Sequence, residues 1–357
     1  MALVSIGLSD SFQNFLPQQL SLHAKGILLV VLFLVFYQAG LRILTWLQVV
    51  MSLQLLTALF MYALPVFVMS GANVWAGTHI TSGFFMAIIL ASNICLGFQI
   101  IIELGEEIKQ PEKNIPLALL IGGAVILLIY LAIIFAYTSA IGPANAGQKI
   151  KLLDTARPYL GNLVIAFLQL GMISAGLTSY NGAAIALPRE IFSMSRDFTL
   201  PKWLSKVNAQ GNPTNAVTGF FGLVIAILSV GQLLDSAGIM KSFFADDVIE
   251  FYGFMTILGI MMLTLMLNAA AYRMADKYPQ SYSRAYIRFS KAWLRFFIIV
   301  SSVFAIVLIA IICTKWLVPF LFLVFTLFVV VYYVLRKRYL QQKGIRIGRY
   351  YQPEGWQ

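Results

Sequence analysis

Small and polar side chains interrupt one long apolar run of the sequence, between positions 80 and 103. Ser92, Asn93, Cys95 and Gly97 lie near the middle of this run. Because Gly is about 1 kcal/mol less favourable than Ala inside a helix, unwinding is expected there. An unwound segment would offer backbone N–H and C=O groups to a polar small molecule at the centre of a membrane. The alternative is a close helix crossing that requires small residues.

Three acidic residues follow where this run ends. Glu103, Glu106 and Glu107 share one face of a continuous helix and would repel one another by a few tenths of a kcal/mol. One interpretation is an inner gate or a proton relay. The other is an interfacial ion pair with cations of the segment 189–206, which would fix the helix to that loop.

The elements that must position these residues are membrane-spanning helices. Hydrophobic residues make up 60% of the 357 residues, charged residues 11%, and the mean hydropathy is +0.84. Soluble domains carry about 25% charged residues, so the chain is predicted to be an all-α polytopic membrane protein. About nine transmembrane helices are predicted, at 26–41, 43–69, 80–103, 115–141, 159–187, 215–234, 248–271, 296–313 and 316–335.

The Lys and Arg residues are distributed unequally between the two sides of these spans. Nineteen of the 25 fall on the side that includes the C-terminal tail, and six fall on the other side. Cytoplasmic loops carry the excess of positive charge, which predicts a cytoplasmic C-terminus and an external N-terminus. This pattern explains the net charge of +11 as membrane topology, without a nucleic-acid partner. The basic tail 336–357 is expected to contact anionic lipid.

Residues typical of catalysis or metal binding are sparse. Cys95 and Cys313 are far apart and both lie in apolar spans, so no disulfide framework is expected. Neither His23 nor His79 has a Cys or carboxylate at ligand spacing, so no metal or other cofactor is predicted. No nucleophile–base pair and no phosphate-binding glycine loop is found in the spans, which argues against an enzyme.

Three motifs then indicate a family. Residues 97–116 read GFQIIIELGEEIKQPEKNIP, residues 189–197 read REIFSMSRD before LPK at 200–202 and GNP at 211–213, and residues 278–285 read YPQSYSRA. In order and in spacing they resemble amino acid permeases of the amino acid–polyamine–organocation (APC) superfamily. The first motif resembles the family's sixth helix, the second its loop after helix eight, and the third its approach to helix eleven.

The resemblance implies a LeuT-like inverted-repeat fold with an incomplete first repeat. The nine spans correspond to family helices four to twelve, and helices one to three have no counterpart. In the family, helix one helps to hold the substrate carboxylate, so a separate polypeptide that supplies the missing helices is a possible partner. The implied segments are an external N-terminal segment (1–25), two helices of the first repeat (26–78), the second repeat (79–271), a basic loop (272–295), a terminal helix pair (296–335) and the basic tail (336–357).

The resemblance also assigns roles to residues. Gln99 occupies the position of a family acid, and Gln54 matches a helix-five lysine of some proton-coupled members; neither glutamine can titrate. The middle of helix eight faces the family's binding site, which singles out Ser179 for coupling and Asn181 for substrate binding. For the Ser and Thr residues of this helix, a bond to a carbonyl one turn back is the alternative.

These observations predict a secondary active transporter of amino acids or related amines, an antiporter or symporter that works by alternating access in the plasma (inner) membrane. Its predicted partners are membrane lipid and the small-molecule substrate. The alternative function is that of a truncated or decayed permease, or of a non-transporting membrane scaffold or sensor.

Overall fold

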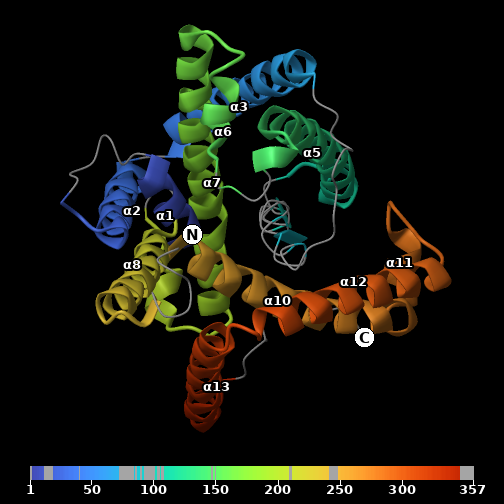
Figure 1. The fold of residues 1–357 in the computed structure, drawn as a ribbon. Coiled ribbons are helices and arrows are strands. Elements are labelled where there is room, and N and C mark those ends of the chain that lie inside the picture. Colours follow the sequence, from blue (N-terminus) through green and yellow to red (C-terminus); the bar gives the residue numbers. More distant parts are fainter. Residues whose placement is uncertain are drawn as a thin grey trace. The chain divides into compact units, whose positions relative to one another are not determined.

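Helices are the only regular secondary structure among the residues that the computed structural model describes, which confirms the all-α prediction (Figure 1). It describes residues 2–11, 19–39, 41–71, 84, 87–88, 91, 101–102, 105, 108–145, 148, 150–208, 211–240 and 248–345. The α-helices are α1 (Ala2–Ser11), α2 (Leu22–Ala39), α3 (Leu41–Ser70), α5 (Pro111–Ile141), α6 (Leu152–Ala156), α7 (Asn162–Arg196), α8 (Thr214–Ser236), α10 (Val248–Lys277), α11 (Pro279–Arg284), α12 (Lys291–Ile312) and α13 (Leu317–Gln342). Two short 3₁₀ turns are η2 (Pro143–Asn145) and η3 (Lys202–Ser205).

Seven of the described helices are long and apolar enough to cross a membrane. They are α3, α5, α7, α8, α10, α12 and α13. Helix α2 contains a shorter apolar stretch, Leu22–Val35, and the predicted span 80–103 falls mostly outside the described residues. The chain is therefore a polytopic membrane protein, as its composition predicts.

Five helices run past their predicted apolar spans, and they do so at one end only. On the side predicted to be cytoplasmic, α5, α7, α10, α12 and α13 are four to nine residues longer than the spans. At their opposite ends the same helices agree with the prediction to within three residues. Hydropathy marks where the apolar stretch ends, whereas the backbone remains helical into the charged residues beyond.

The largest difference from the sequence prediction is at Pro188. We expected the helix to stop at Leu187, but α7 contains Pro188 and continues to Arg196. A proline inside a helix removes one backbone hydrogen bond but does not have to end the helix. The start of the REIFSMSRD motif is consequently helical and is not part of a loop.

The chain forms two compact units, and α7 contributes to both. The first contains residues 3–81 and 117–183. Its core joins Ala58, Tyr62 and Val66 of α3 to side chains of α5, α6 and α7, among them Leu168. The hydroxyl groups of Tyr62 and Thr155 are hydrogen-bonded at 2.8 Å, which ties α3 to α6.

The second unit contains residues 82–116 and 184–357. In it α10 packs against both α12 and α13. The side-chain amide of Asn268 on α10 donates to the hydroxyl groups of Ser301 and Ser302 on α12, at 3.2 and 3.0 Å. Polar bonds between apolar helices stabilise their association, because the apolar contacts alone gain little over lipid.

Candidate functional site

A chain of hydrogen bonds between buried polar groups joins α2, α3 and α7 within the first unit. The Tyr37 hydroxyl donates to the backbone carbonyl of Asn181 at 2.9 Å and also to its Oδ1. Asn181 Nδ2 donates to Gln48 Oε1 at 2.8 Å, and Gln48 Nε2 donates to the carbonyl oxygen of Thr178 at 3.3 Å. We refer to Tyr37, Gln48, Thr178 and Asn181 as the amide network.

The direction of each bond in the amide network is fixed by chemistry. Asn181 accepts through its oxygen and donates through its nitrogen, and it is only 6% exposed. Gln48 likewise uses both ends of its amide. Because a buried amide with an unpaired end costs free energy, each residue constrains the rotamer of the next. The network thus holds α2 and α3 at a defined position along α7.

A neighbouring contact supports this arrangement. Tyr180, directly before Asn181, is fully buried, and its ring lies 4.2 Å from that of Phe33 on α2, measured between centroids. Helix α2 therefore packs against α7 next to the amide network.

Further along α3, Gln54 binds α7 at a second point. Its Nε2 donates to the carbonyl oxygen of Phe167 at 3.1 Å. Its Oε1 is buried and has no hydrogen-bond partner among the described residues. An unpaired buried acceptor costs about 1–3 kcal/mol, so this oxygen is a ready site for a donor from a ligand or from water.

A glycine permits the close approach of α3 and α7 beside Gln54. A Cβ atom added at Gly171 would lie 2.7 Å from Ala58 Cβ and 3.6 Å from Gln54 Nε2. Real Cβ atoms do not approach so closely, so a larger residue would push the helices apart. Small residues at such crossings are typical of membrane helices.

A cavity of about 100 Å³ lies at the same crossing. Apolar residues of α3, α6 and α7 form its walls, among them Leu55, Ala58, Leu153, Gly171 and Met172. Its lining offers no charged group. The space suits a small aliphatic group, and not a charged one.

The chemistry of this region is that of binding. The amide network and Gln54 supply amide, hydroxyl and carbonyl groups. Within the described part of the chain, no three His, Cys, Asp or Glu side chains come together in a way that could hold a metal ion. Neutral donors and acceptors of this kind bind polar small molecules by hydrogen bonds.

The structure places the predicted site residues as follows. Asn181 lies in the amide network, and Gln54 lies at the glycine crossing on the same pair of helices. Ser179 is exposed and lies outside the network. The other predicted residues lie outside the described part of the chain: Ser92, Asn93, Cys95, Gly97, Gln99, Glu103, Glu106 and Glu107.

Sequence reasoning missed Tyr37 and Gln48. The signal for Gln48 was present, because an amide in an apolar span needs partners just as Asn181 does. Tyr37 carries less information, since a tyrosine near the end of a span is a common interfacial residue. For Ser and Thr residues of α7, the alternative to a binding role was a bond to a carbonyl one turn back. Thr178 makes such a bond, because its hydroxyl donates to the Ala175 carbonyl at 3.1 Å.

Comparison with known proteins decides the family. The family model described as amino acid permease matches residues 23–345. The chain belongs to the amino acid permease family. This assignment confirms the resemblance carried by the three motifs, and the family is one of transporters.

The curated relatives of this permease chain are distant. An uncharacterized transporter of Mycobacterium tuberculosis is 27% identical over 217 residues, which cover 58% of this chain and 48% of the relative. A probable agmatine/putrescine antiporter of Lactococcus lactis is 26% identical over 47% of the chain and 36% of the relative. A branched-chain amino acid permease of Bacillus subtilis is 28% identical over 41% and 32%. The matched segments thus span about half, or less, of these relatives.

Proposed function

We propose that the chain acts in secondary active transport of an amino acid or a related amine, by alternating access. The observation that carries this proposal is the family match over residues 23–345, joined to seven described helices that can span a membrane. Two of the relatives are named for the transport of branched-chain amino acids and of agmatine and putrescine, which sets the range of substrates to test.

Gln54 is the described residue best suited to contact the substrate. Its unpaired Oε1 accepts a hydrogen bond, and both amino acids and amines carry an ammonium group that donates. The apolar cavity beside Gly171 receives a small aliphatic part of the same molecule. Asn181 shapes this region through the amide network, and we propose that the segment 92–97 is unwound and supplies further contacts.

The coupling mechanism follows from the neutrality of Gln54. An amide does not change charge between pH 5 and 8, so it cannot pass a proton to or from the substrate site. We therefore propose that transport proceeds by exchange of one substrate molecule for another, or that it is coupled to an ion through a residue other than Gln54. Glu103, Glu106 and Glu107 are the acidic residues that we propose as a gate.

Uptake by proteoliposomes tests the proposal. Purified protein is reconstituted, and uptake of radiolabelled leucine, arginine, agmatine and putrescine is measured with and without the same compound inside. We expect counterflow of at least one of these compounds. Gly97→Leu and Gln54→Leu should each abolish it, whereas Ser179→Ala, an exposed neighbour of the amide network, should leave it unchanged.

Two outcomes would change this conclusion. If the chain transports only when co-reconstituted with a polypeptide that carries a glycine-rich apolar helix, the transporter is a complex of two chains. If neither preparation transports while all variants remain folded, a scaffold or sensor is the better account. Uptake that Gly97→Leu leaves unaltered would remove the segment 92–97 from the site.

A further inference from the structure

The segment 272–297, which joins α10 to α12, is strongly basic. It contains six basic residues, and its one acidic residue is Asp276, so its net charge is +5. Helix α10 has 30 residues and is therefore about 45 Å long, whereas the hydrocarbon core of a bilayer is about 30 Å thick. The end of α10 that carries these charges consequently extends beyond the hydrocarbon, at the level of the lipid headgroups.

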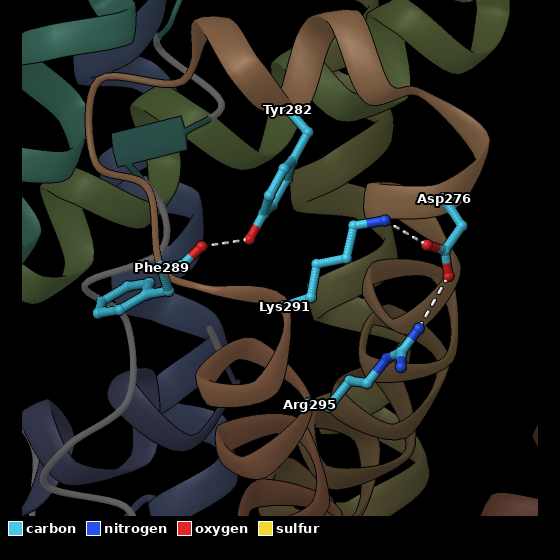
Figure 2. Close-up of polar contacts among 5 residues, drawn as sticks. All are labelled: Asp276, Tyr282, Phe289, Lys291 and Arg295. Carbon is cyan, nitrogen blue, oxygen red and sulfur yellow. Dashed lines mark hydrogen bonds and ion pairs between the residues drawn. The ribbon is translucent and has the colours of Figure 1, made fainter.

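Asp276 orders this segment by binding two cations from α12 (Figure 2). Its Oδ1 lies 2.7 Å from Lys291 Nζ, and its Oδ2 lies 2.9 Å from Arg295 Nη2. In the same segment the Tyr282 hydroxyl donates to the Phe289 carbonyl oxygen at 2.6 Å. These bonds connect the end of α10, the turn around α11 and the start of α12.

An exposed aromatic cluster lies directly beside these charges. The rings of Phe289, Trp293, Phe296 and Phe297 contact one another with centroids 5.6 to 5.8 Å apart. All four side chains are nevertheless 46% to 57% exposed. Aromatic residues with one apolar and one accessible face are typical of the boundary between lipid tails and headgroups.

Three further cations of this segment have described side chains, besides the two that bind Asp276. Arg273, Lys277 and Arg288 are exposed, and none has an acidic partner within the described residues. Lys277 lies over the ring of Tyr278, 5.4 Å from its centroid, and its side chain is still exposed. The surface therefore presents unpaired positive charge next to half-exposed aromatic rings.

We propose that the segment 272–297 is a binding surface for the headgroups of anionic phospholipids. Arg273, Lys277 and Arg288 bind the phosphate groups, and the cluster around Trp293 packs against the upper part of the acyl chains. A phospholipid is the partner that satisfies both features, because it presents phosphate directly above apolar chains. An acidic protein or RNA would satisfy the cations but would leave the aromatic cluster uncovered.

Native mass spectrometry of the detergent-purified full chain tests this proposal. The protein is titrated with phosphatidylglycerol or phosphatidylcholine, and bound lipid is counted. We expect preferential binding of phosphatidylglycerol, and a fall in its apparent affinity of about tenfold in the double variant Arg273→Gln/Arg288→Gln. The double variant Arg273→Lys/Arg288→Lys keeps the charge and should retain most of the binding.

A matched control distinguishes lipid binding at this particular surface from a general attraction of anionic lipid to a basic protein. Lys202→Gln/Lys206→Gln removes two exposed charges from the segment after α7, on the same predicted side of the membrane, and we expect a smaller fall. Equal falls in the two glutamine variants, or no preference of the wild type for phosphatidylglycerol, would overturn the proposal. So would a preference for a soluble RNA over the lipid in a competition titration. The helical circular dichroism signal of each variant verifies that it is folded.

Discussion

A polar side chain inside a membrane helix is stable only when its donors and acceptors have partners. Asn181 meets this condition through Tyr37 and Gln48, whereas Gln54 does so at one end of its amide only. The two residues are therefore expected to differ in role. Asn181 holds helices together, and Gln54 offers an oxygen that a substrate can use.

Removing the Asn181 amide tests the first half of this argument. Asn181→Ala leaves Gln48 Oε1 without its donor and leaves the Tyr37 hydroxyl with only the backbone carbonyl of residue 181, so we expect the free energy of unfolding to fall by about 1–3 kcal/mol. Thermal unfolding of the purified protein in detergent measures the loss. Ser179→Ala, two residues away on the exposed face, serves as the control and should change the melting temperature little. Equal effects of the two variants would contradict the amide network.

Substitution of two glycines on α7 by alanine is predicted to change the stability of the protein in opposite directions. A Cβ at Gly171 would meet Ala58 at 2.7 Å, whereas a Cβ at Gly182 would have no neighbour within 4 Å. Gly171→Ala should therefore destabilise the protein by about 1–3 kcal/mol, because α3 and α7 must separate. Gly182→Ala should stabilise it by up to about 1 kcal/mol, because Ala is the better helix former. Chemical denaturation of both variants under the same conditions measures the difference.

At the scale of whole elements, the sequence predicts where helices cross the membrane but not where they end. Apolar runs identify the seven described spans because twenty apolar residues have no other stable arrangement in lipid. Charged residues beyond the run are good helix formers, so α7 continues nine residues past the predicted end at Leu187. Hydropathy cannot detect that continuation.

The candidate site was predictable to a lesser extent. The family resemblance singled out Asn181 on helix eight and Gln54 at the position of a helix-five lysine, and the structure brings both to the α3–α7 pair. Their partners depend on which faces of the helices meet, and a single sequence does not contain that information. The prediction for the segment 92–97 concerns residues outside the described part of the chain and stays a prediction.

The segment after α7 shows how one element fixes another. Phe198 adopts a left-handed backbone conformation with φ of 63°, which is unfavourable for a residue with a side chain. Arg336 of α13 donates to the carbonyl oxygens of Phe198 and Leu200 at 3.2 and 3.4 Å, and the Tyr332 hydroxyl donates to that of Thr199 at 3.2 Å. Helix α13 thereby holds this turn in place.

Arg336→Leu should release the turn. Loss of the guanidinium leaves the Phe198 and Leu200 carbonyls without their partner, so we expect faster amide hydrogen exchange across residues 195–202. Arg338→Leu removes an equivalent charge from an exposed position on the same helix and provides the control. Arg336→Lys should show an intermediate effect, since a lysine cannot donate to two carbonyls in the same fork geometry. Unchanged exchange in Arg336→Leu would show that α13 does not hold the turn.

For the whole molecule, the distribution of charge predicts its orientation. Nineteen Lys and Arg residues are expected on the cytoplasmic side and six outside. The ends of α7, α10, α12 and α13 that run past the predicted spans are those that carry the basic residues. Short loops rich in Lys and Arg are retained in the cytoplasm during membrane insertion. The unequal distribution of these residues therefore favours the same orientation at each loop.

Cysteine accessibility in intact cells tests this orientation. Replacing Cys95 and Cys313, the two native cysteines, by serine gives a background without thiols. A cysteine introduced at Gln341 should then react with a membrane-impermeant maleimide only after the cells are opened, because this residue follows the last span on the basic side. A cysteine at Lys151, which lies between α5 and α7, should react in intact cells. Each span places the next loop on the opposite side of the membrane. Labelling of both positions from the same side would therefore require an even number of spans between them, whereas five are predicted.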